Sequence, residues 1–234
     1  MDILRYGSRA LLVEVADLDE AARLHAALVR EPLPGTLELV PAARTVLVRY
    51  DPGATGPDRL ADALRAVDLP ATAPAATAPA ATAPATDAAG TVEIPVRYDG
   101  ADLAEVARLC GLTVPEVIAR HCAATYRVAF CGFAPGFAYL SGVDPALRVP
   151  RRAVPRTRVP AGAVALADEF TGVYPRESPG GWHLLGVTGL SLWDTGADPP
   201  TPLAPGTAVR FTPADPPHLP HPSHLPHSSH PSHP

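Results

Sequence analysis

Hydrophobic and polar positions over the first seventy residues change repeatedly between strand spacing and helix spacing. Alternation with period two predicts a strand, whereas apolar residues that recur every three to four positions predict a helix. Asp17 and Glu20 stand three residues apart before the first helical run, which is the spacing of a capping box. The order strand, strand, helix, strand, strand, helix predicts a small α+β domain over residues 1–70. The elements are expected at residues 3–15 (two short strands, or one strand bent around Gly7 and Ser8), 17–28, 37–40, 45–50 and 60–67.

Residues 71–90 break this pattern. The unit Thr-Ala-Pro-Ala-Ala repeats there, with proline at every fifth position and almost no large apolar side chain. Such a segment cannot build a core, and repeated proline favours an extended, semi-rigid chain. We therefore expect a linker and a domain boundary at these residues.

A second domain, mainly of β-strands, is expected over residues 91–213. It opens with a predicted strand and two helices, each preceded by a capping-box pair, Asp102 with Glu105 and Thr113 with Glu116. Short apolar runs then alternate with Pro and Gly turns, which is typical of a β-barrel or a sandwich. The predicted strands lie at residues 92–98, 126–133, 137–140, 163–167, 183–187, 190–193 and 207–211.

Residues 214–234 form a low-complexity tail in which six histidines recur at every third position among Pro and Ser. A histidine-rich tract can bind metal, but a disordered tail with adventitious nickel or zinc affinity is the preferred interpretation. Cys110, Cys122 and Cys131 are odd in number and lack C-x-x-C spacing, so neither a disulfide framework nor a zinc site is expected.

Composition narrows the classes of function. The net charge of −5 argues against a general nucleic-acid binder. No apolar run approaches the roughly 18 residues that span a bilayer, and the first residues lack the pattern of a secretory signal. We therefore expect a cytoplasmic protein with no membrane partner. The sequence has no Lys, Asn or Gln, so a Walker A phosphate loop and a Schiff-base lysine are both excluded for this chain.

Near the end of the second capped helix of the second domain, His121 shares the inward face of Val114 and Val117. It also meets the negative end of the helix dipole. Two interpretations stay open, a structural histidine with satisfied hydrogen bonds or an acid–base group beside the following loop. That loop, residues 132–140, combines two glycines, one proline and three aromatic residues, and suits either stacking of a planar amide or packing on the core.

Five arginines lie within residues 148–158, and Pro150, Pro155 and the following Pro160 interrupt this part of the chain. Solvated surface charge and a clamp for a carboxylate or phosphate are both open interpretations, because a guanidinium can bind either anion through two hydrogen bonds. The prolines hold the chain on a fixed path, which favours Arg156 and Arg158 as the clamp.

The densest group of turn residues is at 171–182. Residues 178–182 must form a sharply turned loop, and the amides of Gly180 and Gly181 are expected to donate to an oxyanion or a carboxylate. Ser178 lies outside the G-x-S-x-G pattern of a hydrolase nucleophile. Possible acid–base groups, among which nothing singles out a pair, are Asp168, Glu169, Glu177 and Asp194.

Three stretches together resemble the family of 5-oxoprolinase B subunits, also called allophanate hydrolase subunit 1, which includes sporulation kinase inhibitors of Kip type. They are residues 126–140 (YRVAFCGFAPGFAYL), 155–162 (PRTRVPAG) and 171–182 (TGVYPRESPGGW). The resemblance covers residues 1–213 apart from the linker. It implies an N-terminal α/β domain and a C-terminal cyclophilin-like β-barrel. It also implies work with partner proteins, the A and C subunits of 5-oxoprolinase, which together with such a chain couple ATP hydrolysis to the opening of 5-oxoproline to glutamate.

The resemblance further implies which residues act. His121 and Arg156 are expected to be catalytic. ATP is expected as a co-substrate shared with the partner subunits, with a small-molecule amide as substrate and no metal or tightly bound cofactor. Phe170 and Val187 stand where the family usually has Gln and Arg. Contacts with the substrate are expected from Phe133, Tyr139, Arg158, Thr171, Tyr174, Ser178, Gly180, Gly181 and Trp182.

Two other functions stay open within this resemblance. One is a binding module that inhibits a histidine kinase. The other is a carboxyl-transfer subunit of the urea-carboxylase or allophanate type, which would require a biotinylated partner.

Overall fold

A computed structural model describes residues 1–69 and 90–214 of the chain. The expected linker at 71–90 and the expected tail at 214–234 therefore lie almost entirely outside the described residues. None of the helices in the described residues is long and apolar enough to cross a membrane.

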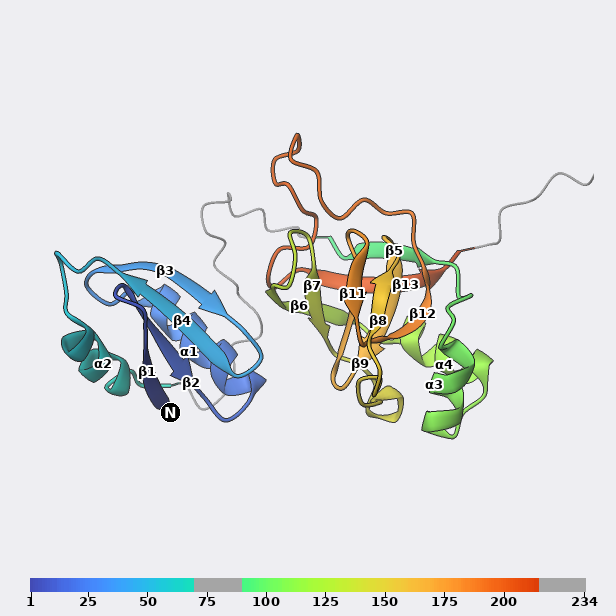
Figure 1. The fold of residues 1–234 in the computed structure, drawn as a ribbon, viewed down its shortest axis with the longest axis horizontal. Coiled ribbons are helices and arrows are strands. Elements are labelled where there is room, and N and C mark those ends of the chain that lie inside the picture. Colours follow the sequence, from blue (N-terminus) through green and yellow to red (C-terminus); the bar gives the residue numbers. More distant parts are fainter. Residues whose placement is uncertain (70–89, 215–234) are drawn as a thin grey trace, which may run out of the picture.

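The first part of the chain forms a four-stranded antiparallel sheet with two helices, in the predicted order (Figure 1). The strand order across the sheet is β1-β2-β4-β3. Alternate residues of β2 and β4 point toward the helices and are buried with Leu24 and Leu28 of α1 and Leu60 and Leu64 of α2. The elements are β1 (Asp2–Tyr6), β2 (Ala10–Glu14), α1 (Leu18–Arg30), β3 (Thr36–Pro41), β4 (Thr45–Tyr50) and α2 (Pro57–Arg65).

Helix α1 begins where the sequence predicts. The Asp17 side chain accepts a hydrogen bond from the Glu20 amide at 2.8 Å, which satisfies one of the free donors at the helix start. Helix α4 (Val114–Ala123) has the complete capping box, because Thr113 and Glu116 each bind the other's backbone amide. Helix α3 (Leu103–Cys110) differs from the prediction: Asp102 precedes it but makes no side-chain cap, since its carboxylate is bound elsewhere.

The second part of the chain is a cyclophilin-like β-barrel, as the resemblance implies. Its seven strands follow the order β12-β9-β10-β7-β6-β13-β5, and a bridge between Arg97 and Val187 brings the chain just after β5 back to β12. A separate ribbon pairs β8 with β11. The strands are β5 (Val92–Val96), β6 (Tyr126–Cys131), β7 (Ala138–Ser141), β8 (Arg156–Val159), β9 (Ala163–Ala167), β10 (Phe170–Val173), β11 (Ser178–Gly180), β12 (His183–Val187) and β13 (Ala208–Pro213), with a short 3-10 helix at Pro145–Leu147.

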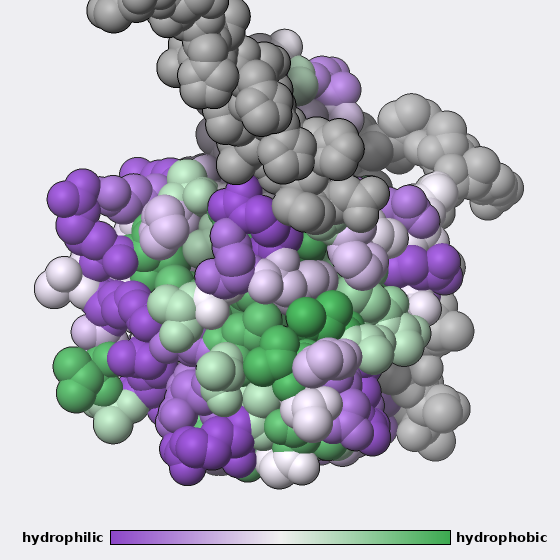
Figure 2. Space-filling model, turned by 90° about the vertical axis from the view of Figure 1, so that its right-hand side faces the viewer, coloured by the Kyte–Doolittle hydropathy of each residue, from purple (hydrophilic) through white to green (hydrophobic). Residues whose placement is uncertain are grey.

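Helices α3 and α4 lie together at one side of the barrel, where α4 packs on β13 and α3 on β12 (Figure 1). The side of the molecule that they occupy is mixed, with hydrophobic surface in the middle and hydrophilic residues around it (Figure 2). The core between the helices and the sheet is formed by apolar side chains such as Val106, Val117, Val209 and Phe211. The helices thus cover one part of the barrel and leave the aromatic residues described below on another.

Four segments of the barrel differ from the predicted set. Residues 190–193 form no strand: Leu192 is buried, but it lies in a loop without ladder partners. Strand β10 was not predicted because all four of its residues are buried, so no polar alternation marks it. Strands β8 and β11 were missed because charged residues, proline and glycine dominate their short sequences.

Candidate functional site

Five aromatic side chains come together on the barrel, and we call them the aromatic cluster. Phe137 is its centre, with ring centroids 5.3 Å from Phe133, 5.3 Å from Tyr174 and 5.5 Å from Trp182. Tyr139 completes it, 5.0 Å from Phe137 and 5.5 Å from Trp182. All these pairs meet edge to face, the arrangement that aromatic rings favour. The structure therefore brings together four residues that the sequence predicts as substrate contacts: Phe133, Tyr139, Tyr174 and Trp182.

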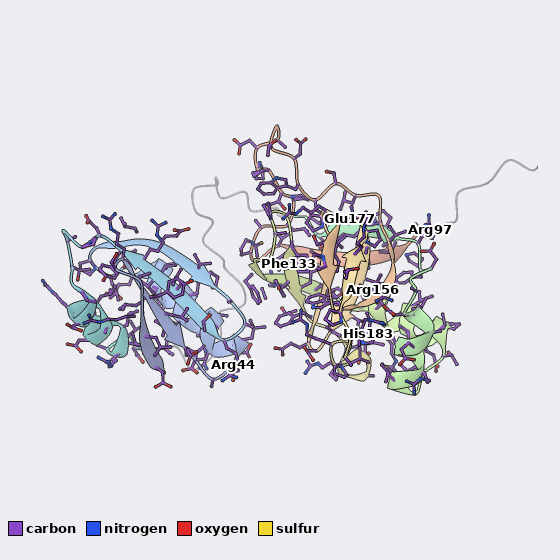
Figure 3. The ribbon with its side chains drawn as sticks, in the orientation of Figure 1. Arg44, Arg97, Phe133, Arg156, Glu177 and His183 are labelled. Atoms are coloured by element: carbon purple, nitrogen blue, oxygen red, sulfur yellow. The ribbon has the colours of Figure 1, made fainter. Side chains whose placement is uncertain are left out.

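Phe133 is the part of the aromatic cluster that faces outward. Its side chain is 57% exposed, whereas Phe137, Tyr174 and Trp182 are buried. Its φ of 65° lies in the left-handed region, which costs a non-glycine residue about 1–2 kcal/mol. In Figure 3 the residue lies at the edge of the barrel near β7. Packing gives no reason for an aromatic side chain to be exposed on a strained backbone. Residues of this kind are found at binding sites.

The turn that carries Phe133 is held by its own backbone and by a glycine. The Phe137 amide donates to the Ala134 carbonyl at 3.0 Å, and the Gly132 amide donates to the Phe137 carbonyl at 3.2 Å. Gly136 has a φ of 80°, and a Cβ placed on it would lie 2.8 Å from the Leu192 carbonyl oxygen. Only glycine fits there, so the close approach of the two loops fixes where the turn sits.

The glycine-rich loop after β11 packs against Tyr174. Burial raises the pKa of the Tyr174 hydroxyl, and the nearby Trp182 amide acts in the opposite direction. A Cβ on Gly180 would lie 2.2 Å from the same hydroxyl oxygen, so this position requires glycine. The Gly181 carbonyl accepts from the Arg152 amide at 2.8 Å. Part of the loop's backbone is thus used to hold the aromatic cluster, and the predicted role of the Gly180 and Gly181 amides as oxyanion donors stays a prediction.

Asp102 is a buried carboxylate whose ion pairs the sequence did not reveal. Its carboxylate is only 3% exposed and accepts two hydrogen bonds from Arg156 (2.7 and 2.8 Å) and one from Arg152 (2.6 Å). It also accepts one from the Leu184 amide at 2.8 Å. Burial is the largest single influence and raises the pKa of Asp102, but the Arg156 and Leu184 hydrogen bonds and the two positive charges outweigh it and lower the pKa. This carboxylate joins α3, β8 and β12.

Arg156 is placed by that ion pair. Figure 3 shows it on β8, and both of its terminal nitrogens bind Asp102. Arg158 on the same strand makes a two-point ion pair with Glu177, at 3.0 and 2.9 Å, on the exposed surface. Both arginines that the sequence favours as an anion clamp therefore have a carboxylate of this chain as partner, and their predicted roles with a ligand stay predictions.

His121 lies in the core and not at the aromatic cluster. Its Nδ1 accepts from the Tyr98 hydroxyl at 2.7 Å, and its Nε2 donates to the Thr171 hydroxyl at 3.1 Å. Thr171 in turn donates to the Ala165 carbonyl at 2.9 Å, which fixes the direction of this chain of hydrogen bonds. Complete burial lowers the pKa of His121 to about 3, so it is neutral at ordinary pH. These contacts favour the interpretation of a structural histidine with satisfied hydrogen bonds.

The remaining predicted residues have local roles in the structure. Thr171 is fully buried beside His121. Ser178 is buried at the start of β11, and its hydroxyl donates to the Arg176 carbonyl at 3.2 Å. Phe170, expected near the site, packs edge to face on Phe130 and Tyr139. Within residues 1–69 and 90–214, no group of three His, Cys, Asp or Glu side chains is arranged to hold a metal ion.

Comparison with known proteins gives a consistent picture. The family model described as "Carboxyltransferase domain, subdomain C and D" matches residues 1–203. The B subunit of 5-oxoprolinase from Escherichia coli O157:H7 is 51% identical over 125 residues, which are 52% of this chain and 57% of that protein. The chain spans about half the length of the curated relatives it matches.

Two solved structures show how far the fold extends. The structure of TTHA0988 is 41% identical with a TM-score of 0.68, over 89% of this chain and 40% of that one. The urea amidolyase of Kluyveromyces lactis is 19% identical with a TM-score of 0.67, over 91% of this chain and 15% of that one. The second similarity shows a shared fold only.

Proposed function

The chain belongs to the family described as carboxyltransferase domain, subdomains C and D, and from this premise we propose that it is the B subunit of an ATP-dependent 5-oxoprolinase. In this role it works with the A and C subunits to hydrolyse 5-oxo-L-proline to L-glutamate while ATP is hydrolysed to ADP and phosphate. Relatives that carry the name of this subunit, at 45–51% identity, support the proposal. A cytoplasmic location, where ATP is available, is part of it.

The observation that carries the proposal is the aromatic cluster with its outward Phe133. The substrate is a small ring that contains a planar amide, and such a ring can pack against the faces and edges of Phe133 and Tyr139. Packing of this kind holds the ring in one orientation and keeps water from one side of it. Orientation of the reacting amide contributes to catalysis because the entropy of positioning is lost before the chemical step.

The chemistry of ATP is assigned to the partner subunits. Without lysine this chain lacks the usual side chain for a phosphate-binding loop. The polarisation of the lactam carbonyl and the delivery of water are therefore shared across the complex, and we expect this chain to be inactive by itself. Its own contribution is to bind and orient the ring.

The test is reconstitution. The full chain is mixed with the A and C subunits, and ADP release is measured with and without 5-oxoproline. We expect release that depends on both 5-oxoproline and this chain. Release that is unchanged when the chain is omitted, or no release in an assembled complex, would reject the proposal. Arg156→Ala is unsuited to this test, because it removes the two-point partner of the buried Asp102 carboxylate and is expected to destabilise the barrel.

One observation favours a second function. The matching family model is described as a carboxyltransferase domain, so transfer of a carboxyl group from a biotinylated partner is the alternative. Carboxylation of an amide by the chain and a biotin-carrying partner, with no release of ADP on adding 5-oxoproline, would favour that alternative.

A further inference from the structure

The arginines of residues 148–158 differ in whether they have a partner. Arg152 and Arg156 share Asp102, and Arg158 is paired with Glu177. In residues 1–69 and 90–214, no carboxylate forms an ion pair with Arg148 or Arg151, and both side chains are exposed. The guanidinium groups of Arg148 and Arg151 are therefore available to bind an anion from outside the chain.

The backbone on both sides of Arg151 is fixed to the glycine-rich loop. The Pro150 carbonyl accepts from His183 Nε2 at 3.0 Å, and the Arg152 amide donates to the Gly181 carbonyl at 2.8 Å. One residue earlier, the Val149 carbonyl accepts from the Asp168 amide at 2.7 Å. Arg151 thus lies between two anchored neighbours and beside the segment that carries Trp182 into the aromatic cluster.

The charge of Arg151 reaches the aromatic cluster. Burial raises the pKa of Tyr139 and of Tyr174, and at both hydroxyls Arg151 is the largest influence in the opposite direction. The hydrogen bond between the Arg152 amide and the Gly181 carbonyl places Arg151 next to the segment that carries Trp182, whereas Arg148 lies three residues earlier in the chain. Of the two unpaired arginines, Arg151 is therefore the one placed to act together with the aromatic rings.

We propose that Arg151 is the residue that binds the anionic group of a small, ring-containing carboxylate held against Phe133 and Tyr139 of the aromatic cluster. A guanidinium without an internal partner can donate two hydrogen bonds to a carboxylate, while the aromatic edges contact the ring. This replaces Arg156 and Arg158 in the role of clamp, since both have internal partners. The identification of the ring with 5-oxoproline rests on the proposed function; the carboxylate class of the ligand does not.

The experiment compares a carboxylate with a neutral ring. The complex of this chain with the A and C subunits is titrated with 5-oxoproline and with 2-pyrrolidinone, the same lactam ring without the carboxylate, and binding is followed by calorimetry. Arg151→Ala is expected to weaken 5-oxoproline binding and raise its KM by about 10–100-fold, with little change in kcat, as loss of a charged hydrogen-bonded pair predicts. Binding of 2-pyrrolidinone is expected to stay within about twofold, because it has no carboxylate to lose.

Arg148→Ala is the matched control, because it removes another exposed arginine of the same segment that has no carboxylate partner in the described residues. We expect its affinity and melting temperature to match those of the unmodified chain. Arg151→Lys should recover part of the affinity for 5-oxoproline, since the charge returns without the two-point geometry. Equal losses in Arg148→Ala and Arg151→Ala, or equal losses for the two ligands, would overturn the proposal.

The two proposals fail in different ways. If the complex releases no ADP with 5-oxoproline, the proposed function fails, and the chain alone is then titrated with 5-oxoproline and L-proline by Trp fluorescence. Binding of either carboxylate that is lost in Arg151→Ala and kept in Arg148→Ala supports the site without that function. No saturable binding to either the complex or the chain overturns the site itself.

Discussion

Replacing Asp102 by asparagine should destabilise the barrel domain more than replacing any exposed acid. The substitution keeps the shape of the side chain but removes the charge that two guanidinium groups and the Leu184 amide bind. One carboxylate oxygen is replaced by an NH2 group, which is a hydrogen-bond donor and cannot accept from the donors of Arg156. Removing one member of a buried ion pair costs about 3–5 kcal/mol, because the partner is left without compensation.

The exposure of the partners reduces this figure. The side chains of Arg152 and Arg156 are 29% and 25% exposed, so water can solvate them in the variant. We therefore expect a loss of about 2–4 kcal/mol in the free energy of unfolding. For a domain of this size, that corresponds to a fall of roughly 6–15 °C in the melting temperature.

The assay is thermal and urea unfolding followed by circular dichroism, with Asp99→Asn as the matched control. Asp99 pairs with its near neighbour Arg97, but both side chains are about half exposed, so its loss should cost less than about 1 kcal/mol. A double substitution, Asp102→Asn with Arg156→Gln, should lose less than the sum of the single losses, since the two residues contact each other.

The pH dependence gives a second check. The folded pKa of Asp102 lies below its ordinary value, so its contribution is fully present above that ordinary value and is lost as the pH falls through the lowered pKa. The difference between the unmodified chain and Asp102→Asn should therefore be constant near neutrality and shrink at strongly acidic pH. A difference below about 0.5 kcal/mol at pH 7 would refute the role assigned to this carboxylate.

Three further predictions concern other parts of the barrel. Burial lowers the pKa of His121 to about 3, so as the pH falls below about 6.5 this histidine takes up a proton in the unfolded chain but not in the folded one. The free energy of unfolding should therefore fall by up to about 1.4 kcal/mol per pH unit. In urea melts between pH 6.5 and 5, His121→Gln should lack this slope. Gly180→Ala should lower the free energy of unfolding by about 1–3 kcal/mol and weaken ligand binding, because its Cβ would clash with Tyr174. Gly181→Ala should lower it much less, because its Cβ would meet nothing nearer than 3.8 Å. Equal melting temperatures of the two variants would contradict this. Phe133→Gly should leave the melting temperature unchanged or raise it, since glycine adopts the left-handed φ of this position without strain. The same variant should bind 5-oxoproline more weakly in calorimetry. A large fall in its melting temperature would show that Phe133 is a packing residue.

Local signals were sufficient for much of the fold. The capping pairs Asp17 with Glu20 and Thr113 with Glu116 start their helices because each pair satisfies backbone donors within its own turn. The hairpin at β3 and β4 follows from alternation across a short turn. Such features depend on neighbours in the sequence, so a single sequence contains what is needed to find them.

The ion pairs of Asp102 could not be predicted from its neighbours in the sequence. Its spacing to Glu105 is that of a capping box, and nothing nearby distinguishes a cap from an ion pair. The partner that decides the matter, Arg156, is 54 residues away, and the closing of the barrel brings the two together. For the same reason the arginine segment could be found from the sequence while the choice among its members could not: Arg156 and Arg151 differ only in which carboxylates the fold places beside them.

The aromatic cluster was partly predictable. The turn residues around Phe133 and the glycines before Trp182 marked two loops as unusual, and both contribute to the cluster. That the loops meet depends on the strand order β9-β10-β7, which the sequence pattern did not contain because β10 is buried on both faces. Phe137, at the centre of the cluster, was therefore noted as a loop residue but not as a site residue.

The most direct test of the proposed role is the formation of L-glutamate from 5-oxoproline by the complex of this chain with the A and C subunits in the presence of ATP. With the unmodified chain, we expect glutamate to form in proportion to the ADP released, and with Arg151→Ala we expect the same only at much higher 5-oxoproline concentration. Glutamate formed at the same rate without this chain, or with a dependence on 5-oxoproline that Arg151→Ala leaves unchanged, would contradict the claim that the barrel binds and orients the substrate.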